Sequence, residues 1–105
     1  MKGANGPVAS EMFYEKRVKS LGGLMREISV MDADAGIRVV GRYGGHNCYC
    51  FLTRFGGVYT ALIYSRSARR KAPGRLLSSI ELKSPQQIRQ LLLDVTGKKV
   101  IAFAY

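Results

Sequence analysis

A pair of glycines, Gly56 and Gly57, constrains the fold of this chain more than any other feature of its sequence. The pair separates two runs, 48–55 and 58–66, that are rich in β-branched and aromatic residues, which favour strands. Two-residue loops with glycine join antiparallel strands in tight hairpins, so the sequence predicts a hairpin with its turn here. The turn sets the register, and it pairs Phe55 with Val58, Thr53 with Thr60, Phe51 with Leu62 and Tyr49 with Tyr64.

Alternate side chains of a strand point to opposite faces, and the two faces of this predicted hairpin differ in character. One face is mainly small and aliphatic, which suits packing under a helix, and it carries Cys48, Cys50, Leu52, Arg54, Tyr59, Ala61, Ile63 and Ser65. The other face, here called the aromatic face, carries Tyr49, Phe51, Thr53, Phe55, Val58, Thr60, Leu62 and Tyr64. A preceding strand, 37–43, joined by a four-residue turn at 44–47, adds Arg38 and Arg42 to the aromatic face.

The N-terminal part of the chain predicts a helical segment. Apolar residues recur at helical spacing after Ser10 and continue to about Met31. Gly22 and Gly23 interrupt this stripe, and each costs about 1 kcal/mol relative to alanine inside a helix. The segment therefore divides into two pieces, of which 20–31 is the firmer helix.

The C-terminal part predicts a strand, a helix and a last strand. The strands occupy 75–83 and 99–105. Between them, Ser84 is a suitable N-cap, Pro85 suits the first helical position, and Gln87 completes a capping box.

These elements together predict an α+β fold. The chain forms one domain over residues 1–105, in which 1–9 is a loose tail. The sheet has four to five mainly antiparallel strands, and the N-terminal helical segment and the C-terminal helix pack on it.

The chain is strongly basic, with 17 Lys and Arg against 7 Asp and Glu, a formal net charge of +10 and a pI near 10.1. Most of the cations are Arg, whose planar guanidinium group stacks on bases and holds phosphate in a bidentate manner. The segment 65–75 carries five cations and no acid. A charge balance of this kind draws a protein to polyanions, above all to nucleic acid.

The aromatic face is a second indication of nucleic-acid binding. Bases stack on aromatic rings while Arg and Lys hold the phosphates, and single strands are bound in this way with little sequence preference. We therefore predict a non-enzymatic protein that binds single-stranded RNA or DNA, with Tyr49, Phe51 and Tyr64 stacking on bases. The full predicted site comprises Arg38, Arg42, Tyr49, Phe51, Phe55, Tyr64, Arg66, Arg69, Arg70, Lys71 and Arg75.

Three other interpretations fit the same residues. The aromatic face could be the core under the N-terminal helix, with the Arg head groups reaching outward to water. It could instead form a homodimer or another protein contact, as in a basic interaction or assembly subunit. A duplex-binding protein of the chromatin or ribosomal type would also carry this charge.

The sequence offers little to a metal site or to catalysis. The only His and Cys residues in the chain are His46, Cys48 and Cys50, whereas a structural zinc takes four ligands. Asp32 and Asp34 could hold a divalent metal for phosphodiester cleavage, but they are equally typical of a helix end followed by a turn. We therefore predict no metal, no cofactor and no enzymatic activity.

The two cysteines also bear on the compartment. Cys48 and Cys50 are too close in sequence to staple distant parts of a domain. The start of the chain lacks the pattern of a secretory signal, and no apolar run approaches the roughly 18 residues that span a bilayer. These features predict a reducing, cytoplasmic location without membrane binding.

Three segments carry a resemblance to a known family: "RVVGRY" at 38–43, "CYCFLTRFGGVYTALIYSR" at 48–66 and "RLLSSIELKSPQQIRQLL" at 75–92. Their order resembles that of small archaeal single-strand-binding proteins related to ThermoDBP, through the layout of elements over about half of the chain. The resemblance implies that single strands bind in a sheet cleft lined by aromatic and basic residues.

Overall fold

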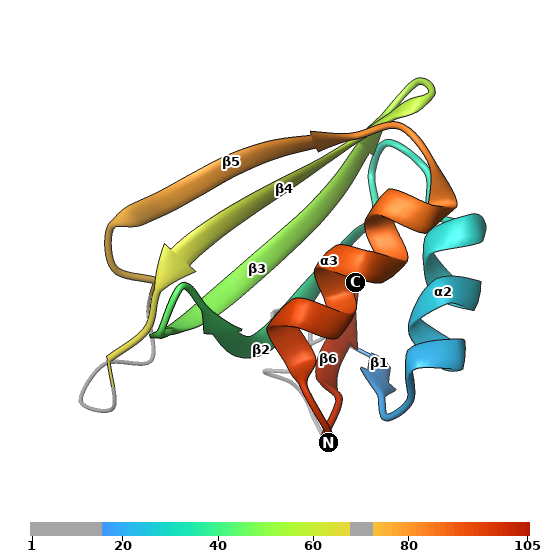
Figure 1. The fold of residues 1–105 in the computed structure, drawn as a ribbon. Helices are drawn as coiled ribbons and strands as arrows, with labels where there is room; N and C mark the ends of the chain where they lie inside the picture. The colour runs from blue at the N-terminus through green and yellow to red at the C-terminus, as the bar shows by residue number, and fades with distance from the viewer. Residues whose placement is uncertain (1–15, 68–72) are drawn as a thin grey trace, which may run out of the picture.

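The computed structural model describes residues 16–67 and 73–105 of the chain. Its elements in chain order are β1 (Lys16–Val18), α2 (Leu21–Ser29), β2 (Gly36–Tyr43), β3 (His46–Phe55), β4 (Val58–Ser65), β5 (Leu76–Leu82), α3 (Pro85–Thr96) and β6 (Ile101–Ala104). The strands form one antiparallel sheet in the order β1-β6-β2-β3-β4-β5. Figure 1 shows α3 lying across the sheet and α2 beside α3, and both contribute to the same core. The predicted α+β class is confirmed.

The register predicted for the central hairpin is confirmed. Phe55 lies opposite Val58 across the turn, and Tyr49 lies opposite Tyr64 at the far end. Side chains on the aliphatic face of this hairpin, such as Leu52, are buried beneath the helices. The face predicted for each side chain of β3 and β4 from the two-residue turn at Gly56 and Gly57 is therefore correct.

The predicted four-residue turn between β2 and β3 is wrong. Only Gly44 and Gly45 form the turn, and Tyr43 pairs with His46. Both glycines have positive φ, 58° and 83°, which suits a turn whose twist matches that of the flanking strands. The shorter turn moves the register by two residues, so Arg38 lies opposite Phe51 instead of Thr53. A shift of two residues leaves every side chain on its predicted face.

The predicted number of strands is also wrong, and so is the helical structure predicted for residues 16–18, although the firmer helix starts at about the predicted residue. Lys16–Val18, which we expected within a helical stripe, forms β1 and pairs with β6. The helix starts after Ser20, whose Oγ accepts a hydrogen bond of 3.0 Å from the N–H of Gly23. Val18 lies opposite Ala102 in this pair, and both side chains are buried in the core. The predicted tail and the helical stripe before residue 16 lie outside the described residues.

The capping residues of α3 are placed as predicted. The Oγ of Ser84 accepts a hydrogen bond of 3.2 Å from the N–H of Gln87. The side chain of Gln87 reaches back and accepts one of 2.8 Å from the N–H of Lys83. The helix ends at Gly97, whose φ of 62° is easily reached only by glycine.

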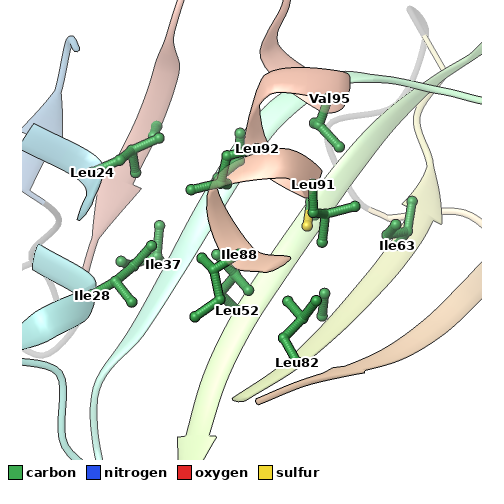
Figure 2. Close-up of a cluster of buried hydrophobic side chains, with 14 of the residues drawn as sticks. Leu24, Ile28, Ile37, Leu52, Ile63, Leu82, Ile88, Leu91, Leu92 and Val95 are labelled. Atoms are coloured by element: carbon green, nitrogen blue, oxygen red, sulfur yellow. The ribbon is translucent and has the colours of Figure 1, made fainter. Parts of the chain in front are cut away.

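The core lies between the helices and one face of the sheet (Figure 2). Helix α3 directs Ile88, Leu91, Leu92 and Val95 at the strands, and α2 adds Leu24 and Ile28 beside them. The sheet contributes only side chains from the face opposite the aromatic one, among them Ile37, Val39, Cys50, Leu52 and Ile63. Both helices therefore bury their apolar side chains against the same face of the sheet, the one opposite the aromatic face.

Gly41 in β2 allows α3 to approach the sheet closely. A Cβ atom at this position would collide with the backbone carbonyl of Val95. We expect Gly41→Ala to lower the free energy of unfolding by about 1–3 kcal/mol, because a carbonyl in a helix cannot move aside cheaply. A Cβ at Gly22, in α2, meets nothing within 4 Å. Urea denaturation should therefore show Gly22→Ala as neutral or stabilising by up to about 1 kcal/mol, and equal losses in both variants would contradict this packing.

Candidate nucleic-acid interface

Neither helix covers the aromatic face in the part of the chain that the structure describes. The strand registers place on this face side chains from β1, β6, β2, β3 and β4, and these form a mixed surface of rings and guanidinium groups. Its members are Arg17, Arg38, Val40, Arg42, Tyr49, Phe51, Thr53, Phe55, Val58, Thr60, Leu62, Tyr64 and Phe103, together with Arg66 just after β4. The interpretation in which this face is the core under the N-terminal helix is therefore wrong.

Guanidinium groups and rings alternate across the sheet. The Phe103 ring centroid lies 5.4 Å from the guanidinium carbon of Arg17 and 4.6 Å from that of Arg38. The Tyr49 ring centroid is 5.8 Å from the guanidinium carbons of both Arg38 and Arg66. Cation–π attraction holds such pairs together, at about 0.5–1 kcal/mol each at exposed sites. The row runs from β1 through β6, β2 and β3 to the residue that follows β4.

Three rings form a cluster in the middle of the aromatic face. Phe51 lies 6.2 Å from Tyr49 in a tilted arrangement and 5.7 Å from Tyr64 edge to face, measured between ring centroids. Phe51 and Tyr64 are half-buried, whereas Tyr49 is only 8% exposed. Phe51 and Tyr64 are thus the more accessible members of the cluster, whereas little of the Tyr49 ring, for which we predicted stacking on bases, reaches the surface.

The other predicted site residues lie around this cluster. Arg42 is exposed at the β2–β3 turn, where its Nη2 donates a hydrogen bond of 3.0 Å to the carbonyl of Gly45. Arg75 is exposed at the same end of the sheet, and its carbonyl accepts a hydrogen bond of 2.9 Å from the N–H of Ser65. Arg69, Arg70 and Lys71 lie outside the described residues.

Phe55 lies apart from the cluster. It is 85% exposed at the tip of the β3–β4 hairpin, about 13 Å along the strand from Phe51 at the rise of an extended chain. Its neighbour Arg54 points to the other face, where its Nη1 donates a hydrogen bond of 2.9 Å to the carbonyl of Met31. Phe55 therefore lacks the close cations that flank the central rings.

The sequence analysis missed Arg17 and Phe103. Residue 17 fell within the expected helical stripe, so it was given no sheet face. Phe103 was detectable, because small alanines at 102 and 104 alternate with larger side chains in the last strand. Ala102 is buried in the core and Phe103 therefore points to the opposite face.

The aromatic face is positive. Among the described residues, Glu81 on the outer strand β5, opposite Thr60, is the only acid that register places there. Lys16 forms an ion pair with Glu27 at 2.8 Å, which links β1 to α2. The Nε atom of Arg66 is buried and has no hydrogen-bond partner among the described residues.

The thiols take no part in this surface. Cys48 and Cys50 are both buried in the core, while His46 is exposed. Burial raises the pKa of Cys48, and burial with the neighbouring Cys48 raises the pKa of Cys50 to about 12. In residues 16–67 and 73–105, no three metal-ligating side chains lie close enough to hold an ion. The Asp32 side chain instead accepts a hydrogen bond of 3.2 Å from the N–H of Asp34, which stabilises a turn.

We expect both thiols to resist a thiol reagent such as DTNB at pH 8 in the native protein and to react quickly in urea. The thiolate is the reactive form, and folding holds the proton on Cys50 up to a pKa of about 12. The same shift stabilises the folded state fully below the unfolded pKa of 9.0 and is lost as the pH rises toward 12. Fast native labelling that tracks one cysteine in peptide mapping would contradict the placement of these side chains.

Neither described helix has the length and apolar character needed to cross a bilayer. Comparisons of the chain with protein-family models, with curated proteins and with solved structures give no match. The likeness to ThermoDBP-related proteins therefore remains a prediction from the sequence, and any account of function depends on the geometry of the aromatic face.

Proposed function

We propose that the protein binds single-stranded nucleic acid on the aromatic face, without catalysis and with little sequence preference. The observation that carries this proposal is the row of alternating guanidinium groups and rings on the face that the helices leave uncovered. Exposed surfaces rich in rings usually mark an interaction site. The net charge of +10 favours a polyanion as the partner.

Each part of the row has a role in this proposal. The exposed surfaces of Phe51, Tyr64 and Phe103 stack on bases, because every base offers a π-face regardless of its sequence. Arg17, Arg42 and Arg66 hold phosphates along the row. Arg38 lies over both the Phe103 and the Tyr49 ring, and its main role is to fix the rings in place.

A single strand fits this surface better than a duplex. The bases of a duplex are stacked on one another and cannot lie on rings of a flat sheet without being unpaired. A duplex-binding protein would hold mainly phosphates, so loss of a ring would matter less than loss of a cation. A protein-interaction subunit would bind a surface of matching shape, and its affinity would depend weakly on salt.

The test is a titration with labelled single-stranded and duplex oligonucleotides at several salt concentrations. If Arg17, Arg42 and Arg66 each neutralise one phosphate, the slope of log affinity against log salt is about −2 for a single strand. We expect Arg66→Gln to reduce this slope by about 0.7. Arg89→Gln, an exposed change on α3, should leave it unaltered. A preference for duplex, or a flat response to salt, would overturn the proposal.

A further inference from the structure

The two edges of the sheet differ in how they are protected from other strands. Natural edge strands are protected by shortness, by charged residues, especially lysine, or by proline. The β1 edge has three residues and includes Lys16 and Arg17. The β5 edge has seven residues, Leu76–Leu82, with no proline or cation and with Glu81 as its one charge. Among the described residues, the β5 edge, outermost in the sheet, is therefore less protected than the β1 edge, above all over its regular part (Figure 1).

Hydrogen bonding shows which β5 groups point outward. The N–H of Ser65 donates to the carbonyl of Arg75 at 2.9 Å, so alternate residues of β4 from Ser65 direct their backbone groups toward β5. Ile63 is one of them and lies opposite Ser78, and Ser78 therefore bonds inward. The next residue, Ser79, directs its N–H and carbonyl away from the sheet, and so does Glu81.

The regular part of this edge is short and can pair with itself. The β4–β5 register is irregular near Tyr64, which leaves Ser78–Leu82 as the continuous part of β5. Two such segments placed antiparallel about Ile80 bring Ser79 of each copy opposite Glu81 of the other. All outward backbone groups of the segment then find partners, and the two half-buried Ile80 side chains meet at the axis.

Charge also favours a second copy at this place. Repulsion between two chains of net charge +10 opposes association over most of the surface. Beside β5, however, an open groove of about 410 Å³ is lined by Glu81 and Asp94 as well as by the apolar side chains of Ile80 and Leu91. Lys83 follows the strand directly. The edge therefore presents both signs of charge, which can pair across a self-complementary contact.

We propose that a second copy of the chain adds to β5, with the two β5 strands antiparallel and Ile80 opposite Ile80. The two-fold axis of such a pair is perpendicular to the sheet, so both aromatic faces lie on one side of a continuous sheet. The inference does not depend on nucleic-acid binding, because it follows from the edge alone. If both proposals hold, the dimer offers a single strand twice the length of surface.

Sedimentation equilibrium of the full chain over a range of concentrations tests the dimer. We expect a monomer–dimer equilibrium that Ser79→Pro shifts at least tenfold toward monomer. The N–H that proline removes points away from the protomer, so the fold is retained and can be checked by circular dichroism. A monomer at all concentrations would overturn the proposal, as would a dimer that Ser79→Pro leaves unchanged.

Disulfide cross-linking tests the register. Opposite residues of a non-hydrogen-bonded pair have Cα atoms about 4.5 Å apart, which a disulfide can span. Mild oxidation should therefore link Ile80→Cys quickly across the axis. Ser79→Cys and the exposed Ser29→Cys on α2 serve as controls. Both should link slowly, because in the proposed dimer the same residue in the two copies lies farther apart than the two Ile80 residues do. Faster linking of either control would overturn the proposed pairing.

Discussion

Phe51→Ala should weaken binding to a single strand by about 5- to 150-fold, the equivalent of about 1–3 kcal/mol for one stacked base. Phe51 is the central ring of the cluster, with Tyr49 and Tyr64 on either side at 6.2 and 5.7 Å. Its removal takes away a stacking surface and the edge that orients Tyr64. Fluorescence anisotropy of a labelled oligonucleotide at fixed salt measures the change directly.

Phe55→Ala is the matched control for this loss. It is the same substitution in the same strand and on the same face, but Phe55 is at the hairpin tip, away from the row of cations. We expect it to weaken binding by less than about threefold. Phe51 is only half-buried on a face without helices, so its variant should unfold at a temperature close to that of the parent. Equal effects of the two substitutions would mean that the binding surface is not centred on the cluster.

Leu92→Ala should lower the free energy of unfolding by about 2–5 kcal/mol. Leu92 is completely buried between α3 and the sheet, and its truncation leaves a cavity that the surrounding strands cannot close (Figure 2). The adjacent Leu93 is 37% exposed on the same helix. Leu93→Ala should therefore change stability by less than about 1 kcal/mol.

Urea denaturation of both leucine variants checks which side of α3 faces the sheet. If Leu92→Ala does not fold, the milder Ile88→Val should still cost about 0.5–1.5 kcal/mol at a neighbouring buried position. A larger loss for Leu93→Ala than for Leu92→Ala would contradict the packing. It would also remove the reason for regarding the aromatic face as the uncovered one.

Local signals in the sequence predicted the hairpin and the C-terminal helix. Gly56 and Gly57 fix the β3–β4 register because a two-residue turn leaves the chain no freedom to slip. Ser84 and Gln87 mark the start of α3 because they satisfy backbone N–H groups at and next to it. Such features depend on residues that are close in the sequence, and for this reason they can be read from it.

The features that the sequence did not reveal depend on distant residues. β1 exists because residues 16–18 pair with 102–104 near the other end of the chain. No local sequence pattern predicts a pairing between segments so far apart. The low exposure of Tyr49 has the same origin, since guanidinium groups from β2 and from the end of β4 meet at its ring. The aromatic face was therefore predicted in outline, whereas the accessibility of its rings and the contribution of Arg17 required the assembled sheet.

Photochemical cross-linking is the most direct test that single strands lie on the face without helices. Irradiating the protein with a short oligothymidylate joins bases to the rings on which they stack, and mass spectrometry locates the joined residues. We predict cross-links at Phe51, Tyr64 or Phe103. Cross-links confined to peptides of α2 or α3, on the opposite side of the sheet, would contradict the account.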